Sequence, residues 1–178
     1  MDENEKRLSI EALRRSQETF VDALSGVPEA EAVWKPAADR WSVLECAEHV
    51  ALVEGGMLRL VRGGTPIDGS AAHDREREER IKSNGQDRSR KLVAPERACP
   101  SGRFPSLSEA VDHFVKSRAQ TVQFVESCQD DLRRLSTPHP VFGQITCQEC
   151  LLLLIGHPIR HAGQVREIRA LARAGQRL

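Results

Sequence analysis

Three short segments of the chain share the pattern Ser/Thr-x-x-Glu, and each precedes a stretch in which apolar residues recur at helical spacing. The segments are Ser42–Glu45, Ser106–Glu109 and Thr146–Glu149. In this capping box, the hydroxyl and the carboxylate each accept one of the N–H groups that a helix leaves unpaired at its start. The pattern therefore predicts three helix starts, which strongly constrains the chain toward an all-α fold.

Apolar residues near the beginning of the chain predict a fourth helix. Leu13, Phe20 and Leu24 lie on one face of a 3.6-residue period, and Gly26 and Pro28 end the pattern. Strand-like alternation with hairpin dipeptides is not evident. The length of 178 residues corresponds to about one domain. We predict a single domain over residues 1–178, folded as an all-α four-helix bundle.

Residues 63–105 interrupt the helical pattern between the second and third predicted helices. Glycines and prolines punctuate both ends, and the middle, from His73 to Lys91, is densely charged with mixed sign. We expect at most a short solvated helix there, which cannot bury much. A long crossover also lets the flanking helices run parallel. The segment is interpreted either as a lid or as a loosely attached insertion, and the sequence favours neither.

The charge balance and the apolar pattern argue against several classes of partner. The chain has 26 Lys and Arg and 26 Asp and Glu, whereas a dedicated nucleic-acid-binding protein carries a basic excess. No apolar run approaches the roughly 18 residues of a membrane span, and the first residues lack a basic and then apolar leader. The cysteines number five, an odd count, and are expected to be reduced thiols. We therefore expect a cytoplasmic protein that binds neither nucleic acid nor membrane.

Histidines lie on the apolar faces of two predicted helices. His157 and His161 are one helical turn apart, with Cβ atoms about 6 Å apart, so both rings can converge on one metal ion. His49 lies on an inward stripe of the second predicted helix and is the natural third ligand. A buried imidazole needs a hydrogen-bond partner or a metal. The spacing alone leaves two interpretations open: a divalent metal with open coordination positions, or three core histidines that are satisfied by carbonyls or water.

Other polar residues fall on the same inward faces. Arg118 lies within the apolar stripe of the third predicted helix, where it could bind an anionic group of a substrate or lay its stem on the core with its head in water. Gln164, one turn after His161, could orient a bound ligand or be an ordinary buried amide. Cys147 and Cys150 form a Cys-x-x-Cys without the strand-to-helix context of redox pairs, so we interpret them as core residues.

Pro158 stands between the paired histidines. Its nitrogen has no hydrogen for the carbonyl of Leu154, and its ring crowds that carbonyl. We therefore predict a kink or a local widening of the helix near residues 154–158, which would loosen the spacing of His157 and His161.

Motifs along most of the chain resemble the DinB-like superfamily, also called DinB/YfiT-like metalloenzymes. They are Trp34-Lys35-Pro36, Trp41-Ser42-Val43-Leu44-Glu45 followed by His49, His139-Pro140-Val141-Phe142-Gly143, and His157 with Arg160-His161 and Gln164. The resemblance implies a four-helix bundle in up-down-down-up order. It also implies a divalent metal, zinc or nickel, held by His49, His157 and His161. Many relatives are dimers, so a homodimer is expected.

The resemblance also suggests a class of reaction. Several relatives are S-transferases or isomerases that use a low-molecular-weight thiol, and a divalent ion with open positions deprotonates a coordinated thiol. We therefore expect a metal-dependent thiol S-transferase acting on a small-molecule substrate. Three alternatives remain: a metal-dependent hydrolase, a non-catalytic metal-binding stress-response protein, and a metal-free bundle that serves for dimerisation.

Overall fold

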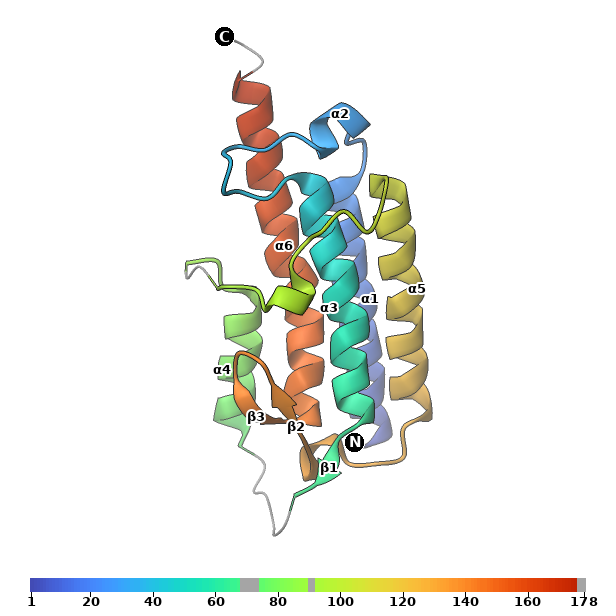
Figure 1. Ribbon diagram of the computed structural model, residues 1–178. Helices are drawn as coiled ribbons and strands as arrows, with labels where there is room; N and C mark the ends of the chain where they lie inside the picture. Colours follow the sequence, from blue (N-terminus) through green and yellow to red (C-terminus); the bar gives the residue numbers. More distant parts are fainter. Residues whose placement is uncertain (68–73, 90–91, 176–178) are drawn as a thin grey trace.

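Four long helices form a bundle in the computed structural model, which describes residues 1–67, 74–89 and 92–175. In Figure 1, α1 runs up from the N-terminus, α3 and α5 both run down, and α6 runs up again. This is the up-down-down-up order that the resemblance implies. The bundle helices are α1 (Glu3–Leu24), α3 (Val43–Arg62), α5 (Leu107–Ser127) and α6 (Cys147–Gly175), with a short α2 (Glu29–Ala32) between α1 and α3.

The predicted capping residues stand at the starts of α3, α5 and α6. Ser42 and Glu45 form the full reciprocal box, and Thr146 and Glu149 form the same pair of hydrogen bonds. At α5 the Ser106 hydroxyl accepts the backbone N–H of Glu109. The first helix has a box as well, formed by Asp2 and Glu5, which the sequence analysis did not identify. The capping pattern therefore predicted the three helix starts correctly.

A small antiparallel sheet lies at the lower end of the bundle and was not predicted. Its strands are β1 (Thr65–Pro66), β2 (Leu135–His139) and β3 (Gly143–Thr146), in the order β1-β2-β3. In the β2–β3 register Thr137 faces Ile145, and both residues are buried. Gly143, which has a positive φ of 68°, starts β3 after the turn. The strands are too short to show a clear alternation in the sequence.

Helix α4 (Arg75–Gln86) belongs to the crossover and packs along the first half of α6, as Figure 1 shows. Gly85 and Gly156 meet at this contact: a Cβ on Gly156 would lie 3.2 Å from the carbonyl carbon of Gly85. Ile81 of α4 is buried in the same interface. The crossover therefore covers the outer face of α6, contrary to the expectation that it cannot bury much.

Ion pairs join this part of the crossover to the bundle. Arg77 pairs with Glu149 at the start of α6, and Arg88 pairs with Glu167 further along the same helix. The described part of the crossover is therefore not a loosely attached insertion. The predictions for residues 68–73 and 90–91 lie outside the described residues. A single turn of 3-10 helix, η1 (Glu96–Ala98), follows before α5, and η2 (Leu132–Arg134) precedes β2.

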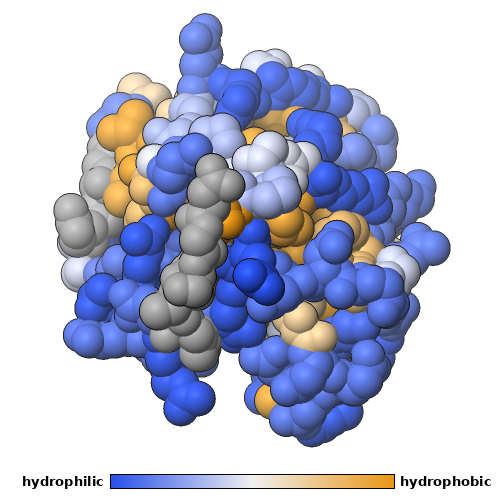
Figure 2. All heavy atoms as spheres, turned by 90° about the horizontal axis from the view of Figure 1, so that it is seen from below, coloured by the Kyte–Doolittle hydropathy of each residue, from blue (hydrophilic) through white to orange (hydrophobic). Residues whose placement is uncertain are grey.

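The buried core consists of two apolar clusters stacked along the bundle. One lies toward α2 and includes Phe20, Val50, Phe114 and Ile168. The other lies toward the sheet and includes Leu13, Met57, Val125 and Leu154. Seen from the sheet end, hydrophilic residues cover most of the described surface, and apolar ones show between them (Figure 2). No helix in the described ranges is long and apolar enough to cross a membrane.

Helix α6 continues as one α-helix through Pro158, so the widened turn predicted at residues 154–158 is not found. The carbonyl of Leu154, which Pro158 cannot bond, instead accepts an N–H from Arg118 at 2.9 Å. A side chain of a neighbouring helix thus satisfies the group that proline leaves unpaired, which a sequence pattern within one helix cannot reveal.

Candidate metal centre

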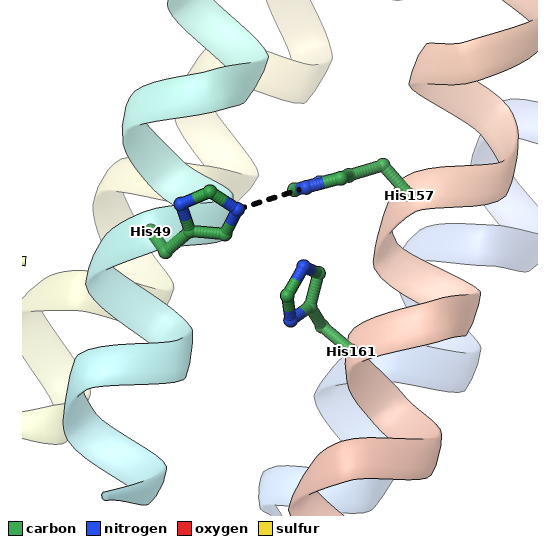
Figure 3. Close-up of side chains that lie close together, drawn as sticks. All are labelled: His49, His157 and His161. Atoms are coloured by element: carbon green, nitrogen blue, oxygen red, sulfur yellow. Dashed lines mark hydrogen bonds between the residues drawn. The ribbon is translucent and has the colours of Figure 1, made fainter. Parts of the chain in front are cut away.

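Three histidine side chains from two helices meet between α3 and α6. His49 of α3 faces His157 and His161 of α6 in Figure 3, and the nearest ring nitrogens of all three lie within 4.8 Å of one another. The Nε2 atoms of His49 and His157 are 3.0 Å apart. Among the described residues, this is the group of His, Cys, Asp and Glu side chains that could hold a metal ion. The structure thus brings together the three residues that the sequence analysis named.

The placement of each ring follows from its helix. His157 and His161 are four residues apart on an unbroken α-helix, so their rings lie on one face with centroids 4.4 Å apart. His49 projects from the facing side of α3, with its ring centroid 4.9 Å from that of His157. His49 and His161 are 5 % exposed, so bulk water does not satisfy their ring nitrogens.

Hydrogen bonds to Nδ1 set the tautomer of two of the three rings. The Nδ1 of His49 is 2.7 Å from the carbonyl oxygen of Ala98, and the Nδ1 of His161 is 2.9 Å from Oε1 of Gln164. Since a carbonyl oxygen only accepts hydrogen bonds, Nδ1 carries the proton and the lone pair lies on Nε2. Such acceptors behind a ligating histidine are typical of metal sites. Gln164 was expected beside the site, whereas the contribution of Ala98 could not be inferred from spacing.

Burial keeps the three imidazoles neutral. Desolvation lowers the pKa of His49, and it lowers the pKa of His157 and His161 well below the ordinary value. The proximity of His161 lowers the pKa of His157 further, and that of His49 lowers the pKa of His161. Neutral imidazole is the form that binds a metal ion. The site is therefore in its ligating protonation state at neutral pH.

Trp41 forms one wall of the site. Its ring centroid is 4.8 Å from that of His49 and 6.3 Å from that of His161. It stands directly before Ser42, the N-cap of α3, so the same turn that starts the helix places the indole against the histidines. In the sequence Trp41 is recognisable only as part of a motif, and this role was not predicted.

Glu48 attaches the segment that carries Ala98. Its carboxylate is 1 % exposed and accepts the backbone N–H groups of Ser101, Gly102 and Arg103. Since Glu48 directly precedes His49 on α3, the end of the crossover is held against the helix that bears the histidine. This role of Glu48 was not predicted, because its backbone partners lie 53 to 55 positions further along the chain.

The donor set fits a divalent transition metal. Neutral imidazole nitrogens are the ligands that zinc and nickel accept, and ligand nitrogens of a tetrahedral zinc site are about 3.3 Å apart. The 3.0 Å between the two Nε2 atoms is close to that spacing. Three ligands leave at least one position for another group, which is the arrangement of catalytic rather than structural zinc sites.

Arg118 does not belong to this pocket. It is 0 % exposed, and its guanidinium donates hydrogen bonds to Glu54, Ser16 and the carbonyls of Leu13 and Leu154. The expectation that Arg118 binds an anionic substrate group is therefore wrong, as is the alternative with its head in water. The acidic partner Glu54 and the acceptors on other helices were not identified from the sequence.

The Cys-x-x-Cys pair packs in the core, as interpreted from the sequence. Both cysteines are 0 % exposed, and their thiols donate to the carbonyls of Val61 and Met57. Burial raises the pKa of Cys147 to about 11 and that of Cys150 to about 12. These thiols are therefore protonated and unreactive at neutral pH.

Comparison with known proteins identifies the family of the chain. The sequence profile of the DinB superfamily matches residues 12–165. The uncharacterized protein YuaE of Bacillus subtilis (strain 168) is 26 % identical over 146 residues, which cover 82 % of this chain and 88 % of YuaE.

Solved structures share the fold at low sequence identity. YfiT of Bacillus subtilis, described as "a probable metal-dependent hydrolase with an unusual four-helix bundle topology", has a TM-score of 0.61 at 13 % identity over 98 % of this chain and 90 % of YfiT. A conserved protein from Enterococcus faecalis has a TM-score of 0.66 at 18 % identity, over 98 % of this chain and 99 % of that one. TT2238, a four-helix bundle protein, has a TM-score of 0.53 at 19 % identity, over 94 % and 98 % of the two chains. With the profile matching most of its length, the chain belongs to the DinB superfamily.

Proposed function

We propose that the protein binds one divalent metal ion through His49, His157 and His161 and uses it in catalysis. The observation that carries this proposal is the convergence of three imidazoles, those of His49 and His161 buried and that of His157 partly buried, whose ring nitrogens lie within 4.8 Å of one another. Hydrogen bonds to Nδ1 direct the Nε2 lone pairs of two of these rings inward. Zinc and nickel are the proposed ions, because both accept neutral nitrogen ligands.

The proposed reaction is the transfer of a low-molecular-weight thiol to a small electrophile. A divalent ion at this site would lower the pKa of a thiol or water that binds to it. The histidines contribute no negative charge, so they leave the full positive charge of the ion to act on the bound group. The indole of Trp41 gives the site an apolar wall, which favours a soft sulfur ligand and limits access of water.

A metal-dependent hydrolase is the second candidate. The observation that favours it is the shared fold with YfiT, which is described as a probable metal-dependent hydrolase. In that case water replaces the thiol at the open position, and the same three histidines hold the ion. The two candidates differ in the nucleophile and not in the ligand set.

Elemental analysis of protein purified without a histidine tag is the first test. We expect about one zinc or nickel ion per chain in the wild type and loss of the ion in His157→Ala. His113→Ala is the matched control, because His113 is exposed and lies outside the histidine cluster. Wild-type protein that binds neither metal would refute the proposal and favour the metal-free bundle.

Turnover assays on metal-loaded protein then separate the candidates. One panel pairs small thiols with electrophiles, and a second contains activated esters and amides without thiol. Thiol-dependent product formation that disappears in His49→Gln supports the transferase, and thiol-independent cleavage that disappears supports the hydrolase. Metal binding without turnover in either panel would favour a non-catalytic metal-binding protein.

A further inference from the structure

A buried polar layer separates the two apolar clusters of the core. On α1, Ser16 lies between Leu13 of one cluster and Phe20 of the other, and the other bundle helices follow the same order. The buried polar side chains of this layer are Ser16 on α1, Glu54 on α3, and Ser117, Arg118 and Thr121 on α5. The group of α6 that contacts this layer is the backbone carbonyl of Leu154.

Arg118 contacts all three other helices of the bundle from the middle of this layer. Its Nε and Nη2 donate to the two carboxylate oxygens of Glu54 on α3, at 2.9 and 2.8 Å. Its Nη1 donates to the Leu13 carbonyl and the Ser16 hydroxyl of α1, at 2.9 and 2.8 Å. The remaining Nη2 hydrogen goes to the Leu154 carbonyl of α6. A guanidinium has five N–H groups, so every donor of Arg118 has an acceptor.

The contact with Leu154 meets a specific need of α6. In a regular helix the carbonyl of Leu154 accepts the N–H of the residue four positions later, which here is Pro158 and has no N–H. Leu154 is 1 % exposed, so water does not replace the missing donor. Arg118 supplies a hydrogen bond to the one carbonyl that the proline leaves unpaired. His157 lies on the helical turn between Leu154 and Pro158.

The same guanidinium also fixes the position of α3 relative to α6. Glu54 lies on α3 a little more than one turn after His49, and Leu154 lies on α6 one turn before His157. The two helices that bear the histidines are therefore attached to one planar, fully engaged group. The 3.0 Å separation of the Nε2 atoms of His49 and His157 depends on how these two helices are placed.

We propose that Arg118 is a positioning residue for the metal centre, replacing the N–H that Pro158 lacks and fixing the α6 turn of His157 against α3. This inference rests on the metal site proposed above, and no contact between Arg118 and the metal or substrate is involved. If Arg118 served core packing alone, its substitution would lower the stability by the same amount whichever residue stands at position 158.

A double-mutant cycle tests the proposal. Arg118→Lys keeps the charge but not the planar fork, and Pro158→Ala restores an N–H for the Leu154 carbonyl. Zinc affinity is measured by chelator competition, with Trp41 fluorescence in a Trp34→Phe background as readout. We expect Arg118→Lys to weaken zinc binding at least tenfold. Pro158→Ala should recover part of that loss in the double variant, because it restores a donor to the Leu154 carbonyl but not the contact with Glu54. Ser16→Ala is the matched control, since it removes only an α1 contact, and its zinc affinity should stay within twofold of the wild type.

The outcomes separate this inference from the proposed function. Arg118→Lys with wild-type zinc affinity, or an equal loss with and without Pro158→Ala, would overturn the positioning role. If the wild type binds neither zinc nor nickel, which refutes the proposed function, the same cycle is read on metal-free protein from the ring ¹⁵N shifts of His49 and His157. Unchanged shifts in Arg118→Lys would then overturn the inference. If Arg118→Lys does not fold, Pro158→Ala must restore folding in the double variant, and failure to do so also overturns it.

Discussion

Acidification should destabilise the metal-free protein through the three clustered histidines. Burial lowers the pKa of His49, His157 and His161 in the folded chain, whereas an unfolded histidine titrates near 6.5. As the pH falls through 6.5, the unfolded chain therefore binds protons that the folded chain does not. The stability contributed by the neutral rings is present above pH 6.5 and is lost as the pH falls toward the folded-state pKa values.

The expected loss is large relative to the stability of a typical domain. For a histidine that stays neutral in the folded state, lowering the pH from about 7 to about 5.5 costs roughly 1.3 kcal/mol of unfolding free energy. His157 and His161, whose pKa burial lowers well below the ordinary value, together give about 2.6 kcal/mol, against a typical stability of roughly 5–15 kcal/mol. His49, whose pKa is also lowered, adds a contribution of the same sign. His139, whose pKa burial lowers to about 4, adds a contribution of the same sign.

Urea unfolding followed by circular dichroism, with a chelator present, measures this loss at both pH values. The triple variant His49→Gln/His157→Gln/His161→Gln is the matched control, because His139 and the carboxylates contribute equally to both proteins. We expect the wild type to lose at least about 2.6 kcal/mol more than the triple variant on acidification. Equal losses, to within about 1 kcal/mol, would refute the argument that buried neutral rings set the acid sensitivity.

Substitutions at three further positions test features of the site and its supports. Glu48→Gln should lower the unfolding free energy by about 2 kcal/mol, because it weakens charge-assisted hydrogen bonds to the backbone of residues 101–103; an unchanged urea midpoint would contradict this. Gln164→Leu should reduce zinc affinity by roughly 10- to 100-fold in chelator competition, whereas Gln164→Glu, which keeps an acceptor, should bind as the wild type does. Gly156→Val should cost about 2 kcal/mol in thermal unfolding, since its side chain would overlap Gly85 of α4; a stabilised protein would show that α4 does not pack as described.

Local patterns predicted the fold and the histidines because the relevant contacts lie within one or two helical turns. The box Ser42–Glu45 and the pair His157 and His161 each depend on residues three or four positions apart, which helix geometry brings together. His49 was found because an inward position on one helix faces an inward position on another.

The partners that complete the site come from distant parts of the chain and leave no local pattern. The contact between Arg118 and Glu54 spans 64 positions, and the contact between His49 and Ala98 spans 49. The donor that satisfies the Leu154 carbonyl was missed for the same reason, since Arg118 lies on α5. Hairpin β2–β3 was missed because its strands are too short for an alternation of apolar and polar residues to show in the sequence.

The hydrogen bond from His49 to Ala98 has a consequence for engineering and for divergence of the sequence. The acceptor that selects the ligating tautomer of His49 lies in the connection between α3 and α5, and not in the four helices. A designer who shortened that connection to obtain a minimal bundle would keep all three histidines and lose the acceptor. The imidazole would then be free to hold its proton on either nitrogen. Deletions in this connection are therefore not neutral with respect to metal binding, although loops of this kind generally tolerate changes in length.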